Sequence, residues 1–319
     1  MVQTPRDRTY RLPTTDLELA VREWGPEDGT PILCLHGWLD NSETWSAFLP
    51  LFLAKNPHCH AVALDFPGHG RSAHKGPEAD YGFYEFARDT IALVNVLGWS
   101  RFAILGHSLG GYVGFMIACS FPTRVTHLMS IEAMHPIIRT NKIAASRLVR
   151  ALQFHEAISR KGRPPARRTY PSLAAIATAR AEWSPLMPLS QHAAEVLMAR
   201  NTAVAPDGTV ENITDVRLKD PAPHTLSAPV ANHAFARITC PVLVVIGHDG
   251  IHAAFPGANE VSNGTPKLDV RELPGHHHLH LDDDVAQVVD CVCNWLADNP
   301  LLTRSEIASG SEFDTPSKL

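Results

Sequence analysis

The chain has 319 residues, of which 45 % are hydrophobic and 19 % are charged. This composition is typical of a globular protein and excludes a disordered chain, a collagen and a coiled coil. The net charge of −5, from 28 basic and 33 acidic side chains, argues against nucleic-acid binding through bulk charge. No stretch approaches the length of about 18 apolar residues that a membrane span requires, so we expect none.

Short apolar segments separated by helical patterns run through the first half of the chain. Residues 17–24 alternate apolar and polar side chains, as a half-buried strand does. Continuous apolar runs predict buried strands at 32–35, 61–64, 102–105, 125–131 and 242–246. Helical patterns lie between them, for example at 83–97 and 112–120. The alternation predicts an α/β fold with a mostly parallel, doubly wound sheet.

The pattern changes after residue 133 and resumes at Thr239. Helical stretches are expected at about 141–157, 172–181 and 191–200, followed by a Pro-rich run to residue 230 without a clear buried strand. We therefore predict a core of residues 1–133 and 239–299, a helical cap insertion of 134–238 over one face of the sheet, and a flexible tail of 300–319.

The candidate nucleophile is Ser108. The apolar run 102–105 is followed by Gly106-His107-Ser108-Leu109-Gly110 and then by a helical pattern. G-x-S-x-G between a strand and a helix predicts a strained turn that projects the serine hydroxyl above the sheet. Gly106 and Gly110 are small because side chains at these positions would collide with the turn. The helix directs its free N–H groups toward the site.

Two further turns follow buried strands. His36-Gly37-Trp38 ends the run 32–35, and the backbone N–H groups of Trp38 and Leu109 are predicted to form an oxyanion hole. Asp65 begins a Gly-rich turn, D-F-P-G-H-G-R-S, after the run 61–64. We expect Asp65 to have a structural role, in which it caps that turn beside the site.

Together these turns resemble the α/β-hydrolase superfamily over nearly the whole chain. Residues 33–41 (LCLHGWLDN) are similar, more narrowly, to the serine hydrolase-like proteins of that superfamily, some of which are peroxisomal. The resemblance implies the α/β-hydrolase fold with an inserted cap and a Ser-His-acid triad. We expect no cofactor.

The resemblance also indicates the base. Residues 273–282 read LPGHHHLHLD, and in members of the superfamily two residues separate the catalytic His from an ending of H-L/M-E/D. Aligning His280-Leu281-Asp282 with that ending identifies His277 as the base. The His-rich run itself contains no carboxylate or thiolate at ligand spacing, so we predict no metal site.

The acid departs from the commonest pattern of the superfamily, which is G-x-x-D after strand seven. Here that stretch is Gly247-His248-Asp249-Gly250, so Gly250 occupies the usual slot and Asp249 stands one residue early. A second slot in the superfamily follows strand six, where this chain has Glu132. A shift of one residue changes the direction of a side chain strongly at a strand end. We favour Glu132 as the triad acid and keep Asp249 as the alternative.

A serine at the elbow excludes the Asp-dependent displacement chemistry of haloalkane dehalogenases and epoxide hydrolases. A Ser-His-acid triad implies acyl transfer to serine, an oxyanion held by two N–H groups, and hydrolysis of the acyl-enzyme. We expect a hydrolase of esters or thioesters with a small acyl substrate. The alternatives are a lactone or carbon–carbon bond hydrolase with the same triad, and a non-catalytic ligand-binding protein on the same fold.

The insertion contains a basic segment. Between residues 139 and 168 Lys and Arg recur, and Glu156 is the only acidic residue. We interpret this segment first as a solvated helix face with a Pro/Arg-rich loop. The alternative is an entrance that attracts an anionic acyl carrier, for which a coenzyme A thioester would be suitable.

The last three residues of the sequence are Ser317-Lys318-Leu319, the S-K-L signal that the peroxisomal import receptor recognises. The polar residues before it suit an arm that presents the signal. We therefore expect the import receptor as a partner and a location in peroxisomes or a related microbody such as a glycosome.

Overall fold

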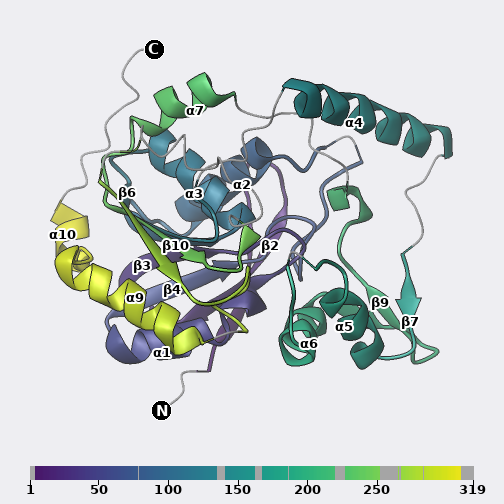
Figure 1. Ribbon diagram of the computed structural model, residues 1–319, viewed down its shortest axis with the longest axis horizontal. Coiled ribbons are helices and arrows are strands. Elements are labelled where there is room, and N and C mark those ends of the chain that lie inside the picture. Colours follow the sequence, from purple (N-terminus) through teal and green to yellow (C-terminus); the bar gives the residue numbers. More distant parts are fainter. Residues whose placement is uncertain are drawn as a thin grey trace.

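A computed structural model describes all residues except 1–3, 78, 135–140, 162–166, 186, 220–226, 252–264, 266, 283 and 310–319. Its central sheet has the order β1-β2-β4-β3-β5-β6-β10-β11 (Figure 1). The strands are β1 (Arg6–Arg11), β2 (Glu18–Trp24), β3 (Thr30–Leu35), β4 (Cys59–Leu64), β5 (Phe102–His107), β6 (Val125–Ile131), β10 (Val242–Gly247) and β11 (Leu268–Leu273). In this sheet the pairs β1–β2 and β2–β4 are antiparallel and the other pairs are parallel, which confirms the predicted mostly parallel sheet.

Helices cover both faces of this sheet (Figure 1). One layer contains α1 (Phe48–Lys55) and α9 (Val285–Asp298), and the other contains α2 (Phe83–Val96), α3 (Leu109–Ser120) and α7 (Ala228–Phe235). Successive strand residues point to opposite faces. Leu33 and Leu35 therefore pack in the core beneath α2 and α3, whereas Ile32 and Cys34 pack beneath α1 and α9. Strands covered on both faces need continuous apolar sequences, which is why the apolar runs located them.

The parallel strands bring distant segments to one edge of the sheet. Strands β3, β5, β6, β10 and β11 run in the same direction, so their carboxyl ends lie at the same edge. The residues that follow these ends include Trp38, Ser108, Glu132, Asp249 and His277. Ligand and catalytic sites of open α/β sheets form at this edge.

The insertion differs from the prediction in two respects. It contains the expected helices α4 (Asn141–Lys161), α5 (Leu173–Ala181) and α6 (Gln191–Arg200), the 3-10 helix η2 (Val216–Lys219), and also a small antiparallel sheet of β7 (Thr169–Tyr170), β9 (Val210–Asn212) and β8 (Thr202–Val204). Strands this short leave no apolar run in the sequence. In addition, α7 packs on α3, with Phe235 and Phe115 at a ring-centroid distance of 5.5 Å. The core therefore resumes before the predicted boundary at residue 238.

Buried polar contacts fasten the insertion to the core. Arg200 of α6 donates to Asp65 Oδ2 through Nε at 2.7 Å and to Asp7 Oδ1 through a terminal nitrogen at 2.7 Å. The side-chain amide of Asn41 donates to the carbonyl oxygen of Leu197 at 2.8 Å. Asp65 thus has the structural role that the sequence predicted, and it also anchors the cap.

The first part of the predicted flexible tail is helical. Thr303 and Glu306 form a reciprocal capping pair at the start of α10 (Arg304–Ser309), because each side chain accepts from the other residue's N–H, at 3.3 and 2.7 Å. Ile307 is buried and holds this helix on the core. The stretch predicted as a flexible tail from residue 300 onward therefore begins with an ordered segment, since this capping signal and apolar anchor lie inside the polar stretch. Ser317, Lys318 and Leu319 lie outside the described residues.

The longest helix, α4, has 21 residues, with charged side chains spread along its length. None of the helices in the described part of the chain combines the length and the apolar character needed to cross a membrane.

Candidate active site

Ser108 lies in a strained turn between β5 and α3. Its φ of 49° and ψ of −114° lie in a region that residues other than glycine rarely adopt. A Cβ atom on Gly106 would lie 2.6 Å from the backbone of Gly110, and one on Gly110 would lie 2.1 Å from the carbonyl oxygen of Leu35. The two glycines therefore let the backbone fold tightly enough to present Ser108 to the cavity beside it.

His277 is paired with Glu132 at the edge of the same cavity. His277 Nδ1 donates a hydrogen bond to Glu132 Oε2 at 3.0 Å, and both side chains are buried. A carboxylate accepts and does not donate, so this bond places a proton on Nδ1 and leaves Nε2 of the neutral ring as an acceptor. The structure thus places Ser108 and His277 in the lining of one cavity, with Glu132 bonded to His277.

Glu132 occupies the space that an acid after β10 would need. Its carboxylate accepts the backbone N–H of Gly247 at 2.7 Å and that of Ile251 at 2.8 Å. A Cβ atom on Gly250 would lie only 2.3 Å from Glu132 Oε1. Glycine in the usual acid slot is therefore a steric requirement of Glu132. The side chain of Asp249, the alternative acid, is exposed, and its backbone N–H donates to the carbonyl oxygen of Gly275.

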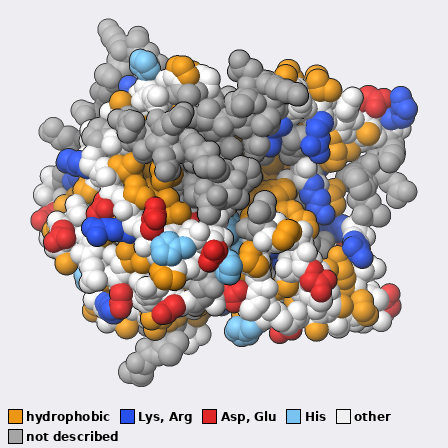
Figure 2. Space-filling model, in the orientation of Figure 1, with side chains coloured by type: hydrophobic (Ala, Val, Ile, Leu, Met, Phe, Trp, Pro, Cys, Tyr) orange, Lys and Arg blue, Asp and Glu red, His pale blue; other side chains and the backbone are white. Residues whose placement is uncertain are grey.

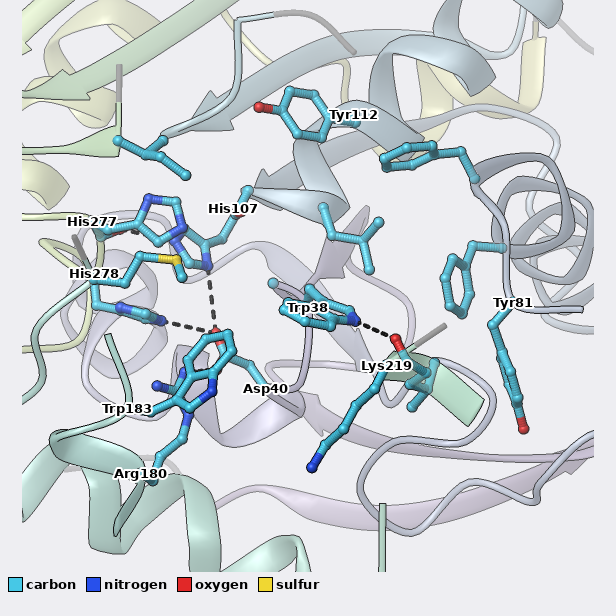
Figure 3. A pocket seen from close by; sticks show the side chains of 18 of the residues that line it. Trp38, Asp40, Tyr81, His107, Tyr112, Arg180, Trp183, Lys219, His277 and His278 are labelled. Carbon is cyan, nitrogen blue, oxygen red and sulfur yellow. Dashed lines mark hydrogen bonds and ion pairs between the residues drawn. The ribbon is translucent and has the colours of Figure 1, made fainter. Parts of the chain in front are cut away.

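The two predicted oxyanion-hole residues line the cavity from two different elements. Leu109 is the first residue of α3, so its N–H has no acceptor within that helix. Trp38 follows β3, and its ring Nε1 donates to the carbonyl oxygen of Leu218 at 2.9 Å. The Trp38 ring also lies 5.5 Å from the ring of Trp183, centroid to centroid. The turn that carries the Trp38 N–H is thus held by residues of the insertion (Figure 3).

The cavity has a volume of about 390 Å³, within the range of small-molecule sites. Much of its wall is apolar or aromatic, from Tyr81, Phe83, Phe86, Leu109, Tyr112, Trp183, Met187, Leu218 and Ile251. Four cationic side chains also line it: Arg147, Arg150, Arg180 and Lys219. Of the basic segment noted in the sequence, Arg147 and Arg150 on α4 therefore face the cavity. Figure 2 shows Lys and Arg side chains gathered on the side of the molecule where Figure 1 places α4 and β7.

Asp40 is a site residue that the sequence did not single out. It is buried, and it accepts from His278 Nε2 at 3.0 Å and from a terminal nitrogen of Arg180 at 2.9 Å. Burial alone would raise the pKa of the Asp40 carboxyl, but His278 and Arg180 hold it well below its usual range. Burial lowers the pKa of the adjacent His107 well below its ordinary value. Asp40 is therefore anionic and His107 neutral near pH 7. The motif H-G-W-L-D, which follows a buried strand, was the available sequence signal.

The chain was compared with curated proteins and family models. The family described as alpha/beta hydrolase fold matches residues 30–284. A serine hydrolase-like protein of Danio rerio is 27 % identical over 302 residues, which cover 87 % of this chain and 85 % of that protein. A probable serine hydrolase of Drosophila melanogaster is 29 % identical over 271 residues, which cover 81 % of this chain and 78 % of that protein.

Solved structures agree with these matches. A hypothetical protein of Pseudomonas aeruginosa has a TM-score of 0.81 and 34 % identity, over 92 % of this chain and 99 % of that one. A thioesterase domain from the curacin biosynthetic pathway has a TM-score of 0.76 and 19 % identity, over 91 % of this chain and 99 % of that one. At this level of identity the similarity supports the fold alone. The chain belongs to the α/β-hydrolase family and lies close to the serine hydrolase-like proteins, as its motifs suggested.

Proposed function

We propose that the protein is a serine hydrolase that cleaves an ester or thioester through an acyl-enzyme on Ser108. The observation that carries this proposal is the buried His277–Glu132 pair, 3.0 Å between Nδ1 and Oε2, at the cavity into which the strained Ser108 turn opens. A base oriented by a carboxylate beside a serine in this turn is the arrangement that nucleophilic acyl transfer requires.

In this proposal Ser108 Oγ attacks the acyl carbon while its proton passes to His277 Nε2. The Trp38 and Leu109 N–H groups stabilise the oxyanion, and Glu132 stabilises the imidazolium through Nδ1. The imidazolium then protonates the leaving alcohol or thiol as the acyl bond to it breaks. A water molecule, deprotonated by His277, releases the acid from Ser108. Each protein group named here lies at the carboxyl edge of the sheet.

We further propose an anionic substrate, with an acyl-coenzyme A thioester as the candidate. The cavity is apolar enough for an acyl chain, and cations from α4, α5 and η2 line it. Arg180 is already paired with Asp40 at 2.9 Å, whereas Arg150 is exposed on α4 at the cavity. Phosphates of an acyl carrier would therefore meet the α4 side of the entrance.

The first prediction concerns the nucleophile and the base. Ser108→Ala will abolish labelling by a fluorophosphonate probe. His277→Ala will lower kcat for p-nitrophenyl esters by at least about 10⁴-fold, because no other group takes the serine proton. The exposed neighbour His276 provides the matched control, and His276→Ala will stay within a few-fold of the unaltered chain. Undiminished labelling of Ser108→Ala would refute the assignment. Equal losses of kcat in folded His276→Ala and His277→Ala would also refute it.

The second prediction concerns the acid. Glu132→Gln will lower kcat by about 10³–10⁴-fold, because the amide disturbs the tautomer of His277, whereas Asp249→Asn will have little effect. The carboxylate can also be moved from the end of β6 to the turn after β10. Glu132→Gly empties the space beside residue 250. Adding Gly250→Asp to this variant will raise kcat at least about tenfold above that of Glu132→Gly alone. Gly250→Asp alone will inactivate the enzyme, since it collides with Glu132. A larger loss in Asp249→Asn than in Glu132→Gln would make Asp249 the acid.

The third prediction concerns substrate charge. Arg150→Ala will raise KM for acyl-coenzyme A several-fold and leave KM for an uncharged p-nitrophenyl ester unchanged, and added salt will reduce the difference. Arg160 is the control, because it lies on the same helix, is paired with Glu156 at 2.9 Å and does not line the cavity. The same rise in KM in Arg160→Ala, or no rise in Arg150→Ala, would exclude a specific anion contact at α4.

The fourth prediction concerns location. We propose that Ser317-Lys318-Leu319 directs the protein to peroxisomes or a related microbody through the import receptor. A fluorescent protein fused to the N-terminus of the chain will give a punctate pattern that overlaps a peroxisomal marker, and deletion of residues 317–319 will leave it in the cytosol. Punctate import of the shortened chain would disprove this role for the tripeptide.

A further inference from the structure

A buried group of possible metal ligands lies beside the candidate triad. One ligand atom each from Asp40, His107 and His278 lies within 4.8 Å of the other two, and all three residues are buried and line the cavity (Figure 3). The His-rich run has no carboxylate of its own, but the fold supplies one from the turn after β3. Asp40 stands 238 positions before His278 in the chain.

The ring of His107 is oriented so that one nitrogen faces Asp40 without a hydrogen bond. His107 Nε2 donates to the carbonyl oxygen of His277 at 2.9 Å, since a carbonyl only accepts. Nδ1 therefore points to Asp40 Oδ2 at 3.7 Å, too far for a hydrogen bond, and it is buried with no hydrogen-bond partner among the residues that the structure describes. A buried polar atom in this state is costly and indicates a missing partner.

Gly37 leaves room for that partner. A Cβ atom at Gly37 would lie 2.8 Å from His107 Nδ1 and 2.9 Å from Asp40 Oδ2, so a side chain at position 37 would crowd both of these atoms. The Asp40 oxygen is 3.0 Å from His278 Nε2 and 3.7 Å from His107 Nδ1. These two separations bracket the value of about 3.3 Å between ligand atoms of a tetrahedral zinc ion with bonds of about 2.0 Å, and all three ligand atoms lie within 4.8 Å of one another.

We propose that Asp40 Oδ2, His107 Nδ1 and His278 Nε2 form a binding site for a divalent transition-metal ion, with Zn²⁺ as the best match. Two imidazoles and one carboxylate suit zinc, and hard ions such as Mg²⁺ and Ca²⁺ prefer oxygen ligands. Water from the cavity supplies the fourth ligand. His278 must give up its Nε2 proton, and its Nδ1, which makes no hydrogen bond to any described residue, can take it. Arg180 remains on the other Asp40 oxygen.

The site is placed to inhibit hydrolysis, a consequence that rests on the proposed function. His107 holds the backbone of His277 through its Nε2 and coordinates the metal through Nδ1. A dication there raises the energy of the imidazolium that forms on His277 during acyl transfer. Zinc binding therefore lowers kcat.

The test is titration of the metal-stripped full chain with ZnCl₂, followed by calorimetry. We expect one tight site per chain, and Co²⁺ in its place will give the visible absorption of a four-coordinate ion. His278→Ala and Asp40→Asn will each weaken binding by at least about 100-fold, because loss of a ligand costs more than loss of an outer contact. His276→Ala removes an exposed His from the same run and will leave binding unchanged. Thermal unfolding will verify that each variant is folded.

Two results would overturn the site. One is absence of a stoichiometric tight site in the folded chain. The other is zinc binding that survives His278→Ala and Asp40→Asn, which would place the ion on surface side chains. Where Asp40→Asn does not fold, His278→Gln replaces it, since that variant keeps the Asp40–Arg180 pair.

Activity separates the two proposals. Zinc at a concentration that fills the site will inhibit ester hydrolysis, a chelator will restore it, and His278→Ala will lose the zinc sensitivity. Zinc binding without inhibition would contradict the inhibitory role. A folded, metal-free chain without hydrolase activity would contradict the proposed function, whereas the calorimetric titration would still decide the metal site.

Discussion

The buried carboxylate of Glu132 is the constraint on which the candidate site depends. Its φ of 55° is strained, which costs about 1–3 kcal/mol, and its charge is removed from water. It accepts from Gly247 N, Ile251 N and His277 Nδ1 at 2.7 to 3.0 Å, and hydrogen bonds to a charged group contribute about 1.5–3 kcal/mol each. Those bonds join the ends of β6 and β10 to the His277 turn. Gly250 must stay small for this arrangement to exist.

A second constraint couples the insertion to the oxyanion-hole turn. The ring of Trp38 donates to Leu218 and lies against Trp183, and Asp40, two residues later, is paired with Arg180. Each of these partners belongs to the insertion. Displacement of the insertion would therefore move the Trp38 N–H relative to Ser108 as well as open the cavity. In the proposed mechanism, access of substrate and stabilisation of the oxyanion therefore depend on the same set of contacts.

The sequence predicted the parts of this protein that local chemistry determines. Ser108 was recognisable because two glycines and a flanking strand and helix are all adjacent in the chain. Glu132 was favoured because it directly follows a buried strand and Gly250 fills the usual acid slot, although the steric link between the two became visible only in three dimensions. Asp40 was not found, because its partners Arg180 and His278 are far away in the sequence. The short strands β7 to β9 were missed because they bury too little to leave a pattern.

The run of histidines near the C-terminus illustrates how one sequence feature can serve several structural purposes. His277 pairs with Glu132, His278 with Asp40, and His280 Nε2 with the hydroxyl of Thr44 at 2.8 Å. The hydrogen bonds to Glu132 described above come from neutral donors, whereas Asp40 already faces the guanidinium of Arg180. Glu132 thus keeps its charge for an imidazolium on His277, and Asp40 has its charge balanced where it lies. Two adjacent histidines on two carboxylates are therefore not equivalent, and the difference in electrostatic surroundings supports the proposal that His277 is the base.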